Sequence, residues 1–337
     1  MKSVVKILTA AILAVTLGVL LAEGSGGATT PAPISAHTPT ALPAQIPVLV
    51  YHGIGTPSSV VGSVANYNVT LANFQADMKT LAAAGYATIT PAQYAAWLNG
   101  TNSNLPAKPI LITFDDAFTS DTQATSVLAR YGFHAVMFVV TGYADGAYNG
   151  IDNSGYAPWS TVAAMAGQGW YLQLHAGLCG HAYLPYAPAS CLAGLDTAVM
   201  DASHFQYYVW DFGQTDSAYE ARVEADITNG EADLASHAGF PAGWQSTLFA
   251  VPFSAWTNGQ NPWLDGYWAS LFGASFVQQI PSAAEGAAKK YRIRFRLELG
   301  YGARSASYLM SHLNNAAFTR AGATGTVNNA PTLGSGG

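Results

Sequence analysis

Short apolar runs rich in β-branched residues alternate along the chain with segments whose apolar positions recur at helical spacing. The first pattern is typical of buried strands and the second of amphipathic helices. The predicted strands span residues 47–54, 109–115, 134–141, 171–175, 247–253, 274–280 and 291–299. The predicted helices begin at Thr70, at Thr90-Pro91, near Thr119, at Ser217 and at Ser305.

This regular alternation predicts βαβ units and a mainly parallel sheet, and therefore an α/β fold. About seven strands within one folded unit, residues 46–320, favour an irregular (β/α) barrel that is closed or nearly closed. An open doubly wound sheet is the alternative. In both architectures the functional side chains gather at the carboxyl ends of the strands.

The two ends of the chain differ from this folded unit. Residues 1–22 have the pattern of a secretory signal peptide, because two lysines precede the apolar run 7–21 and small residues follow it. The run is shorter than the ~20 residues of a transmembrane helix, so we expect no stable membrane span after cleavage; an uncleaved anchor is the alternative. Residues 23–45 predict a low-complexity linker and residues 321–337 a flexible tail. The chain is expected to be secreted or held in the cell envelope.

Charge and composition narrow the class of partner. The 337-residue chain has a formal net charge of −6, which excludes a nucleic-acid partner because phosphate recognition needs a basic surplus. Aromatic residues make up 12 % of the chain, a supply of flat rings that suits stacking on sugars. We expect a monomer.

Two adjacent carboxylates, Asp115 and Asp116, end an apolar strand in the sequence ILITFDDAF. Charges in such a place are costly without partners. A structural interpretation has one of them cap the helix that begins near Thr119 while the other is solvated. A catalytic interpretation has one carboxylate bind a metal ion while its neighbour takes a proton. The second requires the strand to break into a loop here, because adjacent residues point to opposite sides of a strand.

A pair of histidines follows another predicted strand, in LQLHAGLCGH. His175 ends the strand and His181 lies six residues on, across two glycines that allow the backbone to fold back. One carboxylate and two imidazoles leave coordination positions open, as in a catalytic rather than a structural metal site. Zinc is the expected divalent ion, with cobalt, nickel or iron as alternatives. His pairs at this spacing also occur by chance.

Two further strand ends belong to the same predicted edge of the sheet. His52 ends the first strand, in PVLVYHGI, and is either a pocket residue or a structural hydrogen-bonding group. Pro252 and Phe253 end the strand in TLFAVPFSAW, where proline would close the ladder. In contrast, residues 291–299 (YRIRFRLEL) alternate strictly, which predicts a half-buried strand with its arginines in solvent or against an anionic glycan.

Taken in order, ITFDD, LQLHAGLCGH and FAVPFSAW resemble the three motifs of the NodB-homology polysaccharide deacetylases, carbohydrate esterase family four. PVLVYHGI is most similar to the exported poly-N-acetylglucosamine deacetylase branch. The resemblance implies a NodB-like barrel and a divalent-metal enzyme. It makes Asp115 the general base, Asp116, His175 and His181 the metal ligands, and the Phe253 N–H the oxyanion donor. His52 and Pro252 would then contact substrate.

The chain departs from the family pattern at three places. The metal histidines of the family lie four or five residues apart, not six. The third motif often has an arginine at the position of Ala250 and a glycine at that of Ser254. The closing Leu-x-His motif, which supplies the general acid, has no clear counterpart, because His312 falls on a predicted helix.

The leading functional hypothesis is an exported N-deacetylase that hydrolyses the acetamide groups of an N-acetylated polysaccharide and releases acetate. Its competitor is a catalytically weak or inactive glycan-binding protein on the same scaffold. A third reading is an amidase or esterase of the same fold acting on a small molecule. For the two cysteines, Cys179 and Cys191, we predict a disulfide that tethers the long histidine loop; two buried free thiols are the alternative.

Overall fold

The computed structural model describes residues 42–55, 67–101, 104–148, 155–182, 186–196, 207–241, 243–299 and 306–313. Its strands are β1 (Val48–Tyr51), β2 (Ala87–Thr88), β3 (Pro109–Asp115), β4 (Ala135–Val140), β5 (Trp170–Ala176), β6 (Leu248–Ala250), β7 (Ala274–Val277), β8 (Ile293–Phe295) and β9 (Leu297–Glu298). They form one sheet in the order β5-β4-β3-β1-β9, with β2 beside β3, and a second in the order β6-β7-β8. All of these strand pairs are parallel.

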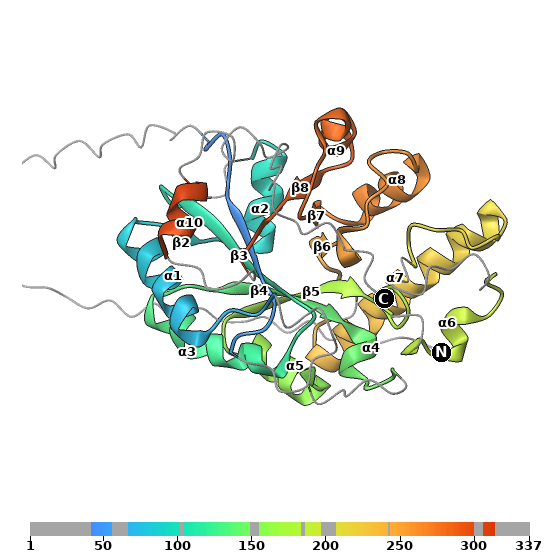
Figure 1. Cartoon of the computed structure of the whole chain (residues 1–337), viewed down its shortest axis with the longest axis horizontal. Coiled ribbons are helices and arrows are strands. Elements are labelled where there is room, and N and C mark those ends of the chain that lie inside the picture. The colour runs from blue at the N-terminus through green and yellow to red at the C-terminus, as the bar shows by residue number, and fades with distance from the viewer. Residues whose placement is uncertain are drawn as a thin grey trace, which may run out of the picture. The chain divides into compact units, whose positions relative to one another are not determined.

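Helices connect the strands and cover the larger sheet, as Figure 1 shows for those on the outer side of β1, β3 and β4. The α-helices are α1 (Leu71–Ala83), α2 (Pro91–Leu98), α3 (Thr122–Arg130), α4 (Thr141–Ala144), α5 (Trp159–Ala166), α6 (Ala189–Leu192), α7 (Asp216–Ala238), α8 (Pro262–Leu271), α9 (Glu285–Lys290) and α10 (Ala306–Leu313). Local sequence sets several of their starts. At the start of α2, for example, the Thr90 side chain accepts a hydrogen bond from the Gln93 backbone N–H, and the Gln93 side-chain oxygen accepts one from the Thr90 backbone N–H. Proline follows at the first helical position.

Side chains, rather than a backbone ladder, join the two sheets between β5 and β6. The amide oxygen of Gln173 on β5 accepts hydrogen bonds from the backbone N–H groups of Thr247 and Leu248, at 2.7 and 2.8 Å. The hydroxyl of Ser246 accepts one from the backbone of Leu174, at 2.8 Å. We call these side-chain contacts between β5 and β6 the β5–β6 seam. Across this seam the strands follow one another in the order of a barrel.

A single residue joins the sheets on the other side. The backbone N–H of Arg296, between β8 and β9, donates to the carbonyl of Val277 on β7 at 2.9 Å. The strand beyond it, β9, pairs with β1, and Leu299 donates to Val50 at 3.0 Å. The last strand of the chain thus passes from the smaller sheet to the larger one. This arrangement is the irregular (β/α) barrel predicted from the sequence.

The seven predicted strands are all present, although the last divides into β8 and β9 and the two-residue β2 was not predicted. The predicted helices match α1, α2, α3, α7 and α10. The expected signal peptide, the tail and most of the linker lie outside the described residues. Among the helices of the described ranges, none has the length and apolar character needed to cross a membrane.

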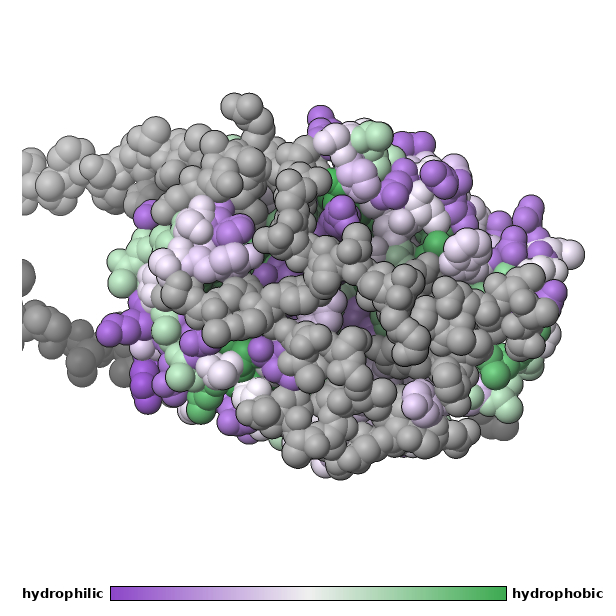
Figure 2. Space-filling model, in the orientation of Figure 1, coloured by the Kyte–Doolittle hydropathy of each residue, from purple (hydrophilic) through white to green (hydrophobic). Residues whose placement is uncertain are grey.

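On the face seen in Figure 2, the described surface is mostly hydrophilic or intermediate, with small scattered hydrophobic areas. Trp210, 59 % exposed, is the one exposed large hydrophobic side chain among the described residues. Apolar side chains are instead buried between the helices and the sheets, where tightly packed rings such as Phe74, Phe114 and Trp268 have no exposed surface. The polar residues buried with them therefore need individual explanations.

Candidate active site

The two predicted carboxylates lie together at the carboxyl end of β3, and both are buried. Asp116 and Ala117 adopt left-handed backbone conformations, with φ of 71° and 56°. This turn breaks the strand alternation that would otherwise send neighbouring side chains to opposite faces. Both carboxylates consequently approach the same imidazole: His175 Nε2 lies 3.9 Å from Asp115 Oδ2 and 3.5 Å from Asp116 Oδ1.

Asp115 is held by an arginine that the sequence reasoning did not select. Two nitrogens of Arg296 donate to the two oxygens of Asp115, each at 2.6 Å. Burial opposes ionisation of this carboxyl, but the Arg296 charge and hydrogen bonds, helped by His175, outweigh it and lower its pKa to about 2. Asp115 is therefore an oriented carboxylate at neutral pH, able to accept a proton.

Asp116, His175 and His181 form the group that could hold a metal ion. One ligand atom from each lies within 4.8 Å of the others, and all three residues are buried. Asp116 Oδ1 has no hydrogen-bond partner and lies 3.5 Å from His175 Nε2 and 3.4 Å from His181 Nε2. A buried carboxylate oxygen facing two imidazole nitrogens fits a divalent cation, which would satisfy all three atoms.

The far side of each imidazole is already engaged, which fixes the ring. His175 Nδ1 lies 2.7 Å from the carbonyl oxygen of Ala250, an acceptor, so Nδ1 carries the proton and Nε2 is left as the ligand. Burial lowers the pKa of His175 to about 4, which keeps the imidazole neutral as metal binding requires. His181 Nδ1 lies 3.1 Å from the hydroxyl of Tyr143, which also donates to the His181 carbonyl at 3.0 Å.

His52 faces the same site from the end of β1. Its Nε2 lies 4.0 Å from Asp115 Oδ2, and its Nδ1 lies 3.3 Å from Oε2 of Glu298 on β9. Burial disfavours the imidazolium, but the Glu298 carboxylate and, beyond it, Asp115 raise the pKa of His52 to about 9. The site therefore contains a protonated imidazole as well as an ionised carboxylate.

Residues Pro252–Ser254 form a sharp turn beside His181. Phe253 and Ser254 both have left-handed backbone conformations, with φ of 55° and 52°. The ring of Phe253 packs on that of His181, with centroids 4.1 Å apart, and Pro252 is buried next to it. Beyond the turn, Trp256 Nε1 donates to Asp265 Oδ1 at 2.9 Å, which ties this segment to α8.

The structure brings every predicted site residue to this region and adds others. The expectation that the arginines of residues 291–299 lie in solvent or against a glycan is wrong for Arg296, which is fully buried. The cause is the passage of the chain between two sheets at this residue, which covers both of its sides.

His312 lies on α10, where its Nδ1 is 2.9 Å from the Tyr308 carbonyl of the same helix. Cys179 and Cys191 form the predicted disulfide.

Residues 102–261 match the model of the polysaccharide deacetylase family. YxkH of Bacillus subtilis strain 168, provisionally named a polysaccharide deacetylase, is 38 % identical over 108 residues, which are 32 % of this chain and 36 % of YxkH. The chain thus spans about a third of the length of that curated relative.

Solved structures of low sequence identity share the fold. The Streptococcus pyogenes deacetylase PplD, determined in complex with acetate, is 18 % identical with a TM-score of 0.53, over 80 % of this chain and 98 % of its own. A de-N-acetylase from Aggregatibacter actinomycetemcomitans is 16 % identical with a TM-score of 0.57, over 78 % of this chain and 98 % of its own. The chain therefore carries a polysaccharide deacetylase domain, matched by the family model over residues 102–261, and shares the fold of these solved deacetylases.

Proposed function

We propose that this chain is a metal-dependent N-deacetylase that hydrolyses acetamide groups of an N-acetylated polysaccharide and releases acetate. The observation that carries the proposal is the grouping of Asp116, His175 and His181 around one point, with the ionised Asp115 beside it. The acetate bound to PplD and the activity named for the Aggregatibacter neighbour support this class of reaction.

Asp116, His175 and His181 would hold the divalent ion, with zinc expected first and cobalt, nickel or iron as alternatives. When bound there, such an ion supplies a Lewis acid for the acetamide carbonyl and lowers the pKa of a water molecule. His175 is ready to bind such an ion, because its buried imidazole is neutral and the Ala250 carbonyl already orients the ring.

The protein side chains would move the protons. Asp115, oriented by Arg296, accepts a proton as water oxygen attacks the acetamide carbonyl carbon. The carbon–nitrogen bond then breaks, and the leaving nitrogen takes a proton, for which the imidazolium of His52 is the donor that this geometry offers. The products are acetate and a free amine on the sugar. The backbone N–H of Phe253, in its strained turn, would stabilise the oxyanion.

The finer parts of the proposal concern location and substrate. The charged and apolar pattern of residues 1–22 supports export to the cell envelope or beyond. His52, beside Asp115, and Pro252, next to Phe253, would contact the polysaccharide. We propose that the protein acts as a monomer on an N-acetylated polysaccharide.

Acetate release from N-acetylglucosamine oligomers, with each divalent ion added in turn, tests the reaction. Wild-type protein should release acetate, and Asp115→Asn should not, while calorimetry should find metal binding in both. An Asp115→Asn variant as active as wild type would contradict the role of this residue. Glycan binding without turnover at any added ion would instead favour the non-catalytic, glycan-binding alternative.

A further inference from the structure

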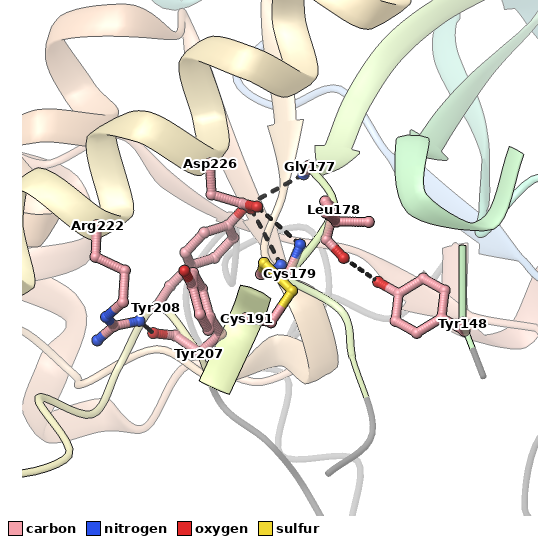
Figure 3. The surroundings of a disulfide bond; sticks show 10 residues. Tyr148, Gly177, Leu178, Cys179, Cys191, Tyr207, Tyr208, Arg222 and Asp226 are labelled. Atoms are coloured by element: carbon pink, nitrogen blue, oxygen red, sulfur yellow. Dashed lines mark hydrogen bonds between the residues drawn. A yellow bond between two sulfur atoms is a disulfide. The ribbon is translucent and has the colours of Figure 1, made fainter. Parts of the chain in front are cut away.

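Residues 177–181, here called the histidine loop, follow β5 and end at His181. This loop is hydrogen-bonded to Asp226, a buried residue of helix α7. The backbone N–H of Cys179 donates to Asp226 Oδ1 at 2.8 Å, and that of Gly180 donates to Oδ2 at 3.1 Å. The hydroxyl of Tyr208 donates to the same Oδ2 at 2.6 Å. Figure 3 shows these donors converging on the carboxylate. Asp226 is therefore attached to the two peptide groups just ahead of a metal-binding residue.

Asp226 differs from Asp115 in the groups that compensate its charge. Asp115 is paired with Arg296, whereas the salt bridges found among the described residues do not include Asp226. Burying a carboxylate is costly unless hydrogen bonds replace its water. Here backbone groups of the histidine loop supply two of the three bonds. The carboxylate thus depends on the loop conformation, and the loop conformation depends on the carboxylate.

Two glycines allow the backbone of the histidine loop to pack directly against helix α7 and Tyr208. A Cβ atom added to Gly230 of α7 would be 2.9 Å from the Cα of Gly177, closer than such atoms approach in proteins. A Cβ atom added to Gly180 would overlap the Tyr208 hydroxyl. The backbone of the loop is consequently in contact with the helix. If the loop moved away from Asp226, it would lose its contacts with Gly230 and Tyr208.

Other attachments hold the opposite side of the loop. Tyr148 donates to the carbonyl of Leu178 at 2.6 Å, and Tyr143 to that of His181 at 3.0 Å. The disulfide joins Cys179 to Cys191 on α6, with Cα atoms 5.4 Å apart. Figure 3 places the disulfide beside Asp226, so covalent and hydrogen-bonded attachments meet at one residue, Cys179.

We propose that Asp226 is a positioning residue for the metal site. Through the N–H groups of Cys179 and Gly180, its carboxylate fixes the position of the His181 side chain. The inference rests on the proposed function, because it gives Asp226 a role only if His181 binds a metal ion. It explains how a histidine six residues after His175 reaches the same point: the longer loop is folded back onto α7 and fixed there.

The direct test is Asp226→Asn, with metal affinity measured by calorimetry on the purified full chain. An amide has one acceptor oxygen, so one loop N–H would face an NH2 group instead. We expect the dissociation constant for Zn²⁺ to rise roughly tenfold to a hundredfold, as for other residues that orient metal ligands. The visible absorption spectrum of the Co²⁺ form should also change, because the position of His181 alters the geometry around the ion.

Glu231→Gln is the matched control. Glu231 is also a buried carboxylate of α7, and its Oε2 accepts a backbone N–H, that of Ser246, at 2.9 Å. It therefore reproduces the cost of changing a buried acid on this helix without touching the histidine loop. The control should keep the wild-type Zn²⁺ affinity and Co²⁺ spectrum, even if its unfolding midpoint falls.

A second variant covers the case in which Asp226→Asn does not fold. Tyr208→Phe removes one of the three donors to Asp226, together with the acceptor of the Gly177 N–H, and leaves the carboxylate in place. It should weaken Zn²⁺ binding by less than Asp226→Asn and shift the Co²⁺ spectrum in the same direction.

The outcomes separate the two proposals. If wild-type protein binds no Zn²⁺ or Co²⁺, the proposed metal site fails and this inference fails with it. If wild-type protein binds the ions and the folded Asp226 and Tyr208 variants match it in affinity and spectrum, only the positioning role is overturned. Equal weakening in Glu231→Gln would also overturn it, because a general loss of helix stability would then account for the effect.

Discussion

The guanidinium of Arg296 donates two hydrogen bonds of 2.6 Å to the carboxylate of Asp115, a residue 181 positions earlier in the chain. Paired donors of this kind fix the plane of a carboxylate as well as its charge. The resemblance to the deacetylase motifs leads one to expect an arginine at the position of Ala250 in the third motif. Here the guanidinium comes from the junction of β8 and β9 and reaches the proposed base from a different strand.

Replacing this arginine by lysine should impair the proposed base. In Arg296→Lys one ammonium replaces the planar pair of donors, so Asp115 loses orientation and its pKa rises from about 2. A base works only when deprotonated, so the fall in kcat on the acid side should begin at a higher pH than in wild type. Arg294→Lys is the control, since Arg294 donates to the carbonyls of Ala288 and Ile293. Identical acid limbs in all three proteins would count against the pairing.

The alkaline side of the pH profile should report on His52. A proton donor is active below its pKa, so activity should fall as the pH rises through that of His52, which the Glu298 carboxylate raises to about 9 against burial. Glu298→Gln removes the main raising charge, and the alkaline limb of kcat should therefore move to lower pH. We would abandon His52 as the donor if the limb stayed where it is in wild type.

The side-chain seam between β5 and β6 should contribute measurably to stability. In Gln173→Met the backbone N–H groups of half-buried Thr247 and buried Leu248 lose their acceptor. Each unsatisfied group costs roughly 1–3 kcal/mol, which should appear in the free energy of unfolding by urea. Gln168→Met, at an exposed position just before β5, should change that free energy by about 0.5 kcal/mol or less. Equal effects of the two substitutions would contradict the seam.

The contribution of Asp265 to the stability of the protein should fall between about pH 4 and pH 6, whereas that of His175, whose pKa burial lowers to about 4, rises over this range. Burial raises the pKa of Asp265 to about 6, although the Trp256 hydrogen bond opposes this, whereas the unfolded chain keeps the usual value of 3.8. In this window the folded state holds the proton more tightly, so a rising pH favours unfolding. Asp265→Asn removes the falling contribution, so its urea midpoint should fall less, or rise more, with pH than that of wild type, and an unchanged slope would argue against this titration.

The strands and the central residues of the site could be predicted because their signals are local. Apolar runs mark β1, β3, β4 and β5, and a polar residue at the end of such a run is conspicuous, as with Asp115 and His175. The parallel strands of a barrel then bring these ends together at one face. The disulfide was predictable from the number of cysteines and the expected export.

The supporting residues gave no comparable signal. Arg296 belongs to an alternating stretch that predicts one solvent face, and only the passage between sheets buries it. Asp226 is one of several acids on the long helix α7, and nothing local distinguishes it from its exposed neighbours such as Glu224. Both residues act through contacts far away in sequence, which hydrophobic periodicity does not encode.

The active site can be complete only after β6, β8 and β9 have joined the first five strands, because the residues that orient His175 and Asp115 lie on or between these later strands. His175 is oriented by the Ala250 carbonyl and Asp115 by Arg296, so both depend on strands at the C-terminal end of the chain. Contacts of such large sequence separation pay a loop-closure cost and form slowly. During synthesis, the first five strands would emerge with an unfinished site that holds ions poorly. Capture of the metal would then mark the finished barrel, and in refolding the Co²⁺ absorption should develop after the far-UV circular dichroism signal.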